Sequence, residues 1–217
     1  MKKKLKTILI GFGNFASGHP EDPRMQKYFR YCSHAEILSS HKTYEWEAVV
    51  EPNNKRRNLA KKKWKVPIVV DNVKNLPANY FVDVAIISSP PDTRLKVLES
   101  INVKKGLLLE KPLASSFEDI IKIKQICEKK KLKTQVNFFR RINKTNIFIK
   151  NEFIKKAIGN LQCGFCVYGK GLKNNAIHYI DLARMIFGEV VYLRSLTEYP
   201  KTKKISISDN FSFILGF

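Results

Sequence analysis

The residues best suited to chemistry follow short apolar runs of the sequence. The stretch Gly11-Phe-Gly-Asn-Phe-Ala16 comes directly after the run Thr7–Ile10 and has the G-x-G-x-x-G/A spacing of a dinucleotide-binding turn. In such a turn the first glycine permits a tight bend, the second lets the backbone approach a pyrophosphate, and the third small residue lets a helix pack on the strand. The candidates for cofactor binding are therefore Gly11, Phe12, Gly13, Asn14, Phe15 and Ala16.

A lysine stands at the end of a second apolar run. Leu107–Leu109 is typical of a strand that is covered on both faces, and Glu110, Lys111 and Pro112 follow it at once. A proline after the lysine restricts the backbone there. A charged side chain held at the mouth of a buried strand is placed to meet a ligand, so Glu110 and Lys111 join the cofactor candidates.

Two further strand ends carry candidates. Glu51 ends the run Trp46–Val50, where an acidic residue about 20 residues beyond the glycines usually binds the ribose hydroxyls. Glu51 comes later than that, and an insertion at about residues 17–32 accounts for the delay; the alternative is an ordinary acid in a turn. Ser89 and Pro90 follow the apolar stretch 82–88 and are cofactor candidates as well.

These residues need a scaffold, and the first 140 residues alternate between strand-like and helix-like segments. We expect strands at 7–10, 46–50, 68–70, 82–88, 107–109 and 135–138, and helices at 33–40, 54–63, 93–100 and 117–131. Such alternation predicts an α/β fold, a doubly wound parallel sheet with right-handed crossovers. Because ligands bind at the carboxyl ends of the strands, the candidates should line one edge of the sheet.

The pattern changes after about residue 140. Helices are expected at 143–157 and 175–187, and strands at 161–168, 190–197 and 211–217. Residues 141–217 are thus expected to form a partial α+β domain with an open, mainly antiparallel sheet. Since the last run ends in mid-strand at Phe217, we expect an incomplete domain with an unpaired, apolar edge.

Composition narrows the class of protein. The chain has 217 residues, of which 44% are hydrophobic, which is typical of a globular protein. No run approaches the roughly 18 to 20 apolar residues of a membrane helix, and glycines interrupt the N-terminal run before a secretory signal is complete. The net charge is +21, but the lysines are spread along the chain without an interleaved aromatic motif. An anionic ligand such as a nucleotide is therefore favoured over nucleic acid. The lack of a membrane helix and of a secretory signal favours a cytoplasmic protein.

The four cysteines are too few and too scattered for a disulfide scaffold. Cys163 and Cys166 form a single C-x-x-C pair with no second pair or nearby histidine, so packing is favoured over metal binding and no metal site is expected.

Four pieces in order resemble the glucose–fructose oxidoreductase, inositol dehydrogenase and rhizopine-catabolism (Gfo/Idh/MocA) family. They are GFGNFA at 11–16, SSPPDTR at 88–94, LLLEKP at 107–112 and NNAIHYIDLARMIFG at 174–188. The resemblance covers nearly the whole chain and implies a Rossmann domain at 1–140 joined to a substrate and oligomerisation domain at 141–217. Family members are usually much longer, so the second domain resembles a truncated one.

The resemblance also implies roles for particular residues. Lys111 of the EKP element would approach the nicotinamide and the substrate hydroxyl, and Pro112 would commonly follow a cis peptide. His178 would act as the catalytic base, since its ordinary pKa suits proton exchange near neutrality. Asn174 stands where many members carry an aspartate and would orient a sugar without ionising. Tyr168 and Lys170 are further candidates for substrate binding, although a structural aromatic and a surface lysine are the simpler interpretation.

The resulting hypothesis is an NAD(P)-dependent oxidoreductase acting on a carbinol of a sugar, cyclitol or sugar nucleotide, in sugar metabolism and by extension surface-polysaccharide biosynthesis. The expected cofactor is NAD or NADP. Glu51 favours NAD, whereas the basic residues Lys55, Arg56 and Arg57 favour NADP. A homo-oligomer is expected for a full-length chain. Two alternatives stay open: a catalytically inactive nucleotide-binding protein or sensor, and a nucleic-acid binder.

Overall fold

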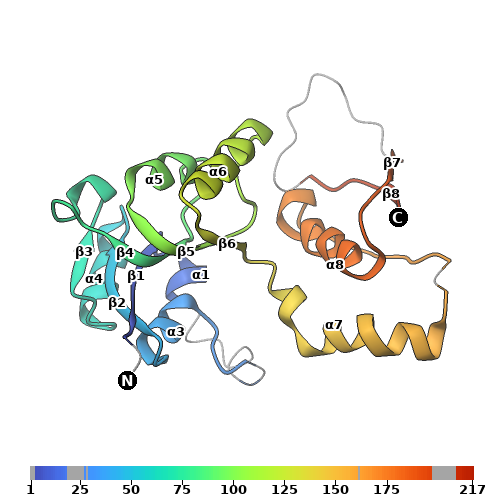
Figure 1. The fold of residues 1–217 in the computed structure, drawn as a ribbon, viewed down its shortest axis with the longest axis horizontal. Coiled ribbons are helices and arrows are strands. Elements are labelled where there is room, and N and C mark those ends of the chain that lie inside the picture. The colour runs from blue at the N-terminus through green and yellow to red at the C-terminus, as the bar shows by residue number, and fades with distance from the viewer. Residues whose placement is uncertain (1–2, 19–26, 28, 161, 197–208) are drawn as a thin grey trace. The chain divides into compact units, whose positions relative to one another are not determined.

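The chain divides into two compact units, unit 1 (Met1–Asn137) and unit 2 (Phe138–Phe217), shown in Figure 1. The computed structural model describes residues 3–18, 27, 29–160, 162–196 and 209–217. Within these residues no helix is long and apolar enough to cross a membrane.

Unit 1 contains a six-stranded sheet in the order β3-β2-β1-β4-β5-β6, and every neighbouring pair is parallel. The strands are β1 Leu5–Ile10, β2 Tyr44–Val50, β3 Ile68–Val70, β4 Val82–Ile87, β5 Val103–Leu109 and β6 Lys133–Val136. The strand order reverses between β1 and β4, so the carboxyl ends of these two strands flank the switch point of a doubly wound fold. The expected fold class is confirmed.

Helices cover both faces of this sheet (Figure 1). They are α1 Asn14–Ser17, α3 His34–Ser40, α4 Asn54–Lys62, the short η1 Val73–Asn75, α5 Arg94–Ser100 and α6 Phe117–Lys129. Ile8 and Ile10 of β1 pack in the core cluster that includes α5 and α6, whereas Leu9 packs with α1, α3 and α4. Successive strand residues point to opposite faces, so a strand buried on both faces is apolar throughout.

Side chains of polar residues fix where three helices begin. The side chains of Ser33, Asn53 and Ser116 accept hydrogen bonds from the backbone N–H of the third residue on, at the starts of α3, α4 and α6. Each satisfies one of the N–H groups that a helix leaves without a partner in its first turn. The polar residues before the predicted helices are therefore their N-caps.

Four strands, β1, β2, β5 and β6, begin earlier than the sequence suggested. β5 starts at Val103 and not at Leu107, because pairing with β4 includes Gly106 and, beyond an irregularity at the exposed Lys104 and Lys105, Val103. Hydropathy marks only the buried half of such a strand.

After the glycine turn, α1 ends at Gly18, which has φ 97°, and the predicted insertion at 17–32 lies mostly outside the described residues.

Unit 2 has a helical part and a small antiparallel sheet. Its elements are η2 Phe139–Ile142, α7 Lys144–Phe148, the π-helix η3 Ile149–Ile158, the π-helix η4 Leu172–Ala176, α8 Ile177–Phe187, β7 Tyr192–Ser195 and β8 Phe213–Gly216. β7 and β8 pair in antiparallel fashion, as expected. The helix expected at 143–157 is thus an α-helix that continues as a π-helix, and α8 is preceded by π-helical residues that the periodicity did not indicate.

The strand expected at 161–168 is wrong. Residues 162–168 form no strand, and Phe165 and Val167 are 93% and 76% exposed. A strand needs a partner for its backbone groups, and the structure shows none for this segment in the part of the chain that it describes. Cys163 and Cys166 lie exposed in the same segment, so the expected packing role of this pair is also wrong. No group of three or more potential metal ligands is found among the described residues.

Candidate functional site

The glycine turn lies at the carboxyl end of β1, against the carboxyl end of β4. Gly11 has φ 84°, and a Cβ added there would lie 2.5 Å from the backbone nitrogen of Ser89. This first glycine therefore allows the turn to pack directly on the chain that follows β4. Gly13 has an extended backbone, φ −69° and ψ 179°, and Nη1 of Arg56, at 3.7 Å, is the one atom of the described residues, neighbouring backbone aside, within 4 Å of an added Cβ.

The other residues of the turn divide between the interior and the surface. Phe12 and Ala16 are fully buried in the cluster beneath α1, and Phe12 contacts the ring of Trp46. Asn14 is exposed, and Phe15 is half exposed with its ring edge on His34. The outer side of the turn thus presents the backbone of Gly13 with Asn14 and Phe15.

Glu51 is buried at the end of β2, and its carboxylate is turned towards the glycine turn. Oε2 accepts a hydrogen bond from the backbone N–H of Phe12 at 2.6 Å, and Oε1 accepts one from the N–H of Asn53 at 2.9 Å. A carboxylate has about four acceptor positions, so both oxygens keep capacity for a ribose hydroxyl. In this arrangement Glu51 fixes the shape of the turn.

The lysine candidate follows β5, next to β4 in the sheet. The peptide between Lys111 and Pro112 is cis, which confirms the expectation from the resemblance. Lys111 is partly buried and Ser89 is buried, whereas Pro90 is exposed. The expected edge is therefore present within unit 1: the glycine turn, Glu51, Ser89 and Lys111 all follow carboxyl ends of neighbouring parallel strands.

A buried arginine holds this edge together. Arg94, at the start of α5, is 3% exposed, and its guanidinium donates to the backbone carbonyls of Ser89 (2.9 Å), Glu110 and Pro112. Burial lowers the pKa of Arg94 to about 10, against the opposing charges of Glu110 and Asp92, so the group stays a cation at neutral pH. One side chain thus ties the chain after β4 to the residues on both sides of Lys111.

The carboxylate of Glu110 is satisfied inside unit 1. Its Oε1 lies 2.8 Å from Nε2 of His34 and accepts a hydrogen bond from the side-chain amide of Asn137 at 2.6 Å. Burial opposes ionisation of Glu110, but the hydrogen bonds from His34 and Asn137 and the charges of His34 and Arg94 outweigh it and lower the pKa. Glu110 therefore acts here as a buried anchor that joins α3, β5 and the chain after β6.

Sequence reasoning missed Arg94, His34 and Asn137. The signal for Arg94 is a basic residue opening a helix with no acidic residue in its first turn, and for Asn137 it is an amide directly after β6. Nothing in the local sequence of His34 indicates its partner, 76 residues away.

In unit 2, the candidate base His178 is buried in the first turn of α8. Its ring makes edge contacts with Phe138 and Phe139, at centroid distances of 6.0 and 5.6 Å. Asn174 is exposed in the π-helical turn η4 before α8, and not in α8 itself. The two residues follow one continuous helical path of mixed type.

The two remaining substrate candidates lie in the loop before η4. The hydroxyl of Tyr168 donates to the carbonyl of Phe211 at 2.6 Å and accepts from the N–H of the same residue at 2.8 Å. Tyr168 therefore fixes the loop to the chain before β8. Lys170 is exposed and has φ 60°.

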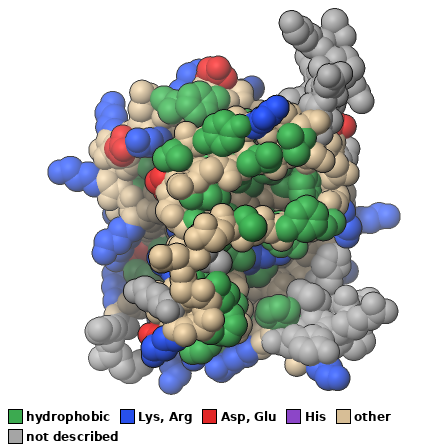
Figure 2. Space-filling model, turned by 90° about the vertical axis from the view of Figure 1, so that its right-hand side faces the viewer, with side chains coloured by type: hydrophobic (Ala, Val, Ile, Leu, Met, Phe, Trp, Pro, Cys, Tyr) green, Lys and Arg blue, Asp and Glu red, His purple; other side chains and the backbone are tan. Residues whose placement is uncertain are grey.

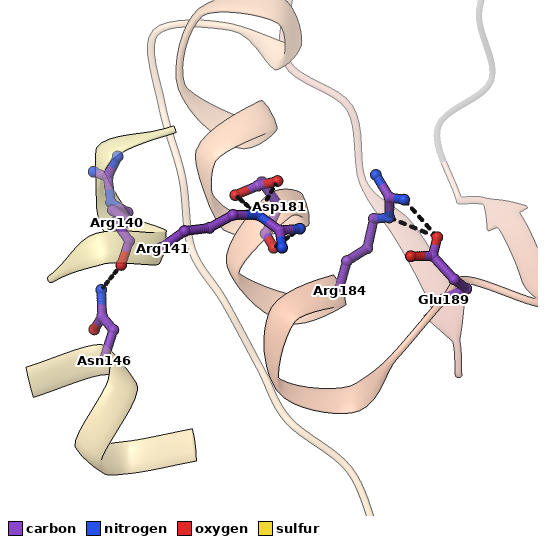
Figure 3. Close-up of polar contacts among 6 residues, drawn as sticks. All are labelled: Arg140, Arg141, Asn146, Asp181, Arg184 and Glu189. Atoms are coloured by element: carbon purple, nitrogen blue, oxygen red, sulfur yellow. Dashed lines mark hydrogen bonds and ion pairs between the residues drawn. The ribbon is translucent and has the colours of Figure 1, made fainter. Parts of the chain in front are cut away.

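Asp181 has a structural partner, as Figure 3 shows. Nε of Arg141 lies 2.8 Å from both carboxylate oxygens of Asp181, and this ion pair joins η2 to α8. A second pair, Arg184 with Glu189, lies on the exposed end of the same helix, at 2.9 Å between Nε and Oε2. Asp181 therefore serves to pack α8 against η2.

The geometry at the sheet edge fits a dinucleotide. Gly13 has no side chain at the position where a pyrophosphate approaches the backbone in such turns, the guanidinium of Arg56 lies beside it, and the acidic Glu51 follows the neighbouring strand. This combination defines the class of dinucleotide-binding proteins with a Rossmann fold.

The comparison of sequences gives the family. Residues 5–138 match the Gfo/Idh/MocA family, described as an oxidoreductase family with an NAD-binding Rossmann fold. The chain belongs to this family. None of the curated proteins matches the chain.

Solved structures show the same fold. An oxidoreductase from Agrobacterium radiobacter in complex with NAD+, L-tartaric acid and magnesium has a TM-score of 0.70 at 22% identity, over 98% of this chain and 63% of that one. The scyllo-inositol dehydrogenase of Lactobacillus casei, with NAD(H) and scyllo-inositol, scores 0.66 at 20% identity, over 90% and 61%. The WlbA dehydrogenase of Bordetella pertussis, with NADH and UDP-GlcNAcA, scores 0.71 at 17% identity, over 98% and 67%. The chain spans about three fifths of the length of the first of these relatives.

Proposed function

We propose that the protein is an NAD-dependent oxidoreductase that transfers hydride between nicotinamide and a carbinol carbon of a sugar, cyclitol or sugar nucleotide. The observation that carries the proposal is the position of Lys111. It follows β5 at the ligand-binding edge of the sheet, and Arg94 binds the carbonyls of the residues on both sides of it. A lysine that served only as a solvated surface charge would need no such support.

The residues that would hold the cofactor are those of unit 1. The backbone of Gly13 would face the pyrophosphate, and Glu51 would accept from the adenosine ribose hydroxyls with its spare acceptor positions. Glu51 repels a phosphate on the same ribose, which is the basis for preferring NAD to NADP. When bound, nicotinamide supplies the hydride acceptor or donor.

The catalytic residues of the proposal are Lys111 and His178. The ammonium group of Lys111 would polarise the substrate oxygen, and the imidazole of His178 would take the hydroxyl proton as hydride leaves the carbon. Asn174 would orient the sugar by hydrogen bonding, with Lys170 and Tyr168 nearby in sequence. Tyr168 is the weakest of these assignments, because its hydroxyl already bonds to the backbone of Phe211 twice.

Chemistry that the fold relatives share supports the proposed substrate class. Structures at low identity were solved with scyllo-inositol and with UDP-GlcNAcA, both of which carry secondary hydroxyl groups. Because Asn174 would orient a sugar without ionising, we favour a sugar nucleotide, and a role in surface-polysaccharide biosynthesis is the corresponding pathway proposal.

The test is turnover of a panel of cyclitols and sugar nucleotides, followed at the nicotinamide absorbance. We expect His178→Ala to lower kcat by roughly 10²–10⁴-fold while leaving cofactor affinity nearly unchanged. Lys111→Met should also lower kcat. Lys122→Met and His41→Ala, at exposed positions, are the matched controls. Turnover that survives both site substitutions would exclude the proposed residues.

A second candidate function is dinucleotide binding without turnover. It is favoured by Asn174, which cannot hold the charge of the aspartate that many members carry. In that case the wild-type protein binds NADH with the same affinity as His178→Ala and turns over no member of the panel.

A further inference from the structure

Three consecutive basic residues, Lys55, Arg56 and Arg57, open α4 beside the end of β2. Cations in the first turn of a helix oppose its dipole, and no acidic residue there offsets them. The three side chains have different surroundings. Nη1 of Arg57 donates to the carbonyl of Glu51 at 2.9 Å and also to that of Pro52. Its guanidinium is therefore bound to the backbone that follows β2.

Arg56 reaches the glycine turn. Its Nη1 is the one described atom, beyond the neighbouring backbone, within 4 Å of a Cβ added at Gly13. The second glycine of such a turn is the position where the backbone comes close to a pyrophosphate. No hydrogen bond or ion pair of the Arg56 guanidinium is found in the described part of the chain. An exposed guanidinium therefore stands beside the expected place of the phosphates.

The carboxylate of Glu51 distinguishes the two places where a dinucleotide can carry phosphate, namely the pyrophosphate and the 2′ position of the adenosine ribose. Glu51 is held against the turn by the N–H groups of Phe12 and Asn53, at the position that follows β2. A second phosphate on the adenosine ribose would approach this negative charge. The pyrophosphate, next to Gly13, would instead meet Arg56.

We propose that Arg56 binds the pyrophosphate of the dinucleotide, and that it serves NAD and NADP alike and does not select for the 2′-phosphate. The proposal rests on the dinucleotide site of the proposed function. A planar guanidinium presents paired N–H donors that match two phosphate oxygens, and the contact is assisted by charge. Arg56 thus adds a side-chain cation to a turn that otherwise offers backbone N–H groups.

The experiment measures the affinity of the wild type and three variants for NADH, NADPH and ADP-ribose by titration calorimetry. ADP-ribose has the pyrophosphate but no nicotinamide and no 2′-phosphate. We expect Arg56→Gln to weaken all three ligands by the same factor, roughly tenfold, as for the loss of one charge-assisted hydrogen bond. Arg56→Lys should keep part of the affinity. Lys62→Gln removes one exposed charge from the last turn of the same helix and should change nothing.

Each other result contradicts the proposal in its own way. Weakening confined to NADPH would assign Arg56 to the 2′-phosphate. Equal affinities of wild type and Arg56→Gln for all three ligands would remove Arg56 from the site while leaving the dinucleotide function intact. A wild-type protein that binds none of the ligands would overturn the cofactor site itself, and the proposed function with it.

Discussion

Gly11 and Gly13 stand two residues apart in one turn, but only Gly11 is packed against the protein. A Cβ at Gly11 would lie 2.5 to 2.7 Å from backbone atoms of Ser88 and Ser89, and its φ of 84° is unfavourable for other residues. Among the described residues, a Cβ at Gly13 meets only the flexible end of Arg56. At the scale of single residues, one glycine is required by the fold, and we propose that the other is required by the ligand.

The two glycines therefore give opposite results on substitution. Gly11→Ala should lower the free energy of unfolding by about 2 to 4 kcal/mol, through strain and backbone displacement. Gly13→Ala should change it by less than about 0.5 kcal/mol but weaken NADH binding at least tenfold. Urea unfolding followed by the fluorescence of Trp46 and Trp64, both in unit 1, measures the first quantity, and calorimetry the second. Equal stability losses in the two variants would contradict this division.

Glu110 makes the stability of unit 1 depend on pH. Its folded pKa lies below the ordinary value of 4.5, because the hydrogen bonds and charges of its partners outweigh its burial. The stabilisation is therefore complete above that ordinary value and is lost as pH falls through the folded pKa. We expect the urea midpoint to fall less steeply between about pH 5 and 2 in Glu110→Gln than in the wild type. Glu99→Gln, at an exposed position of α5, should keep the wild-type slope, and identical slopes in all three proteins would contradict the assignment.

At the scale of elements, α8 is held by ion pairs of two kinds. Asp181 is 8% exposed and receives Nε of Arg141 on both oxygens, whereas Glu189 is 74% exposed in its pair with Arg184 (Figure 3). Removing the buried carboxylate leaves a guanidinium without its partner, while the exposed pair exchanges easily with water. The Asp181 pair should therefore determine how firmly α8 is attached to η2.

Hydrogen exchange of the α8 amides measures this difference. Asp181→Ala should lower the free energy of opening of α8 by about 1 to 3 kcal/mol, and Glu189→Ala by less than about 1 kcal/mol. The reverse order would show that the exposed pair, and not the buried one, stabilises the helix. Exchange in unit 1 serves as an internal reference.

The strands and helices of unit 1 could be predicted from the sequence to within a few residues. The residues that support the candidate site could not. Strands such as 82–87 and 107–109 are buried on both faces and bounded by breakers, so local sequence is sufficient. The strand expected at 161–168 failed because an apolar run becomes a strand only with a partner. The supports of the site, Arg94 and His34, both bind Glu110, at the carbonyl 16 residues from Arg94 and at the carboxylate 76 residues from His34, and no local pattern encodes these bonds.

At the scale of the whole molecule, unit 2 exposes apolar residues on its small sheet. Every residue of β7 is exposed, and Val191, Leu193 and Leu196 are 80%, 65% and 57% exposed. Figure 2 shows hydrophobic side chains gathered on the face turned to the viewer. Exposed apolar residues beside a strand edge favour association, while the net charge of +21 opposes contact between copies.

We therefore expect the chain to self-associate and to do so more strongly as salt is added, because salt screens the repulsion of charges and leaves apolar contact unaffected. Light scattering after size exclusion, at increasing protein concentration, measures the mass. Leu193→Lys should shift the chain towards the monomer, whereas Phe117→Lys, at a 71% exposed position of unit 1, should not. A wild type that stays monomeric throughout, or associates less at high salt, would rule out an apolar interface.

The hydrogen bonds of Arg94 limit which segments of this protein can be exchanged with those of another protein. Its guanidinium binds two loops that follow different strands, the loop after β4 and the turn that carries Lys111. These two segments therefore depend on each other. A foreign chain that received residues 107–113 of this protein without residues 88–94 would gain Lys111 and lack Arg94, which holds it. We therefore expect such a chain to carry Lys111 without the backbone position that the proposed activity requires of it.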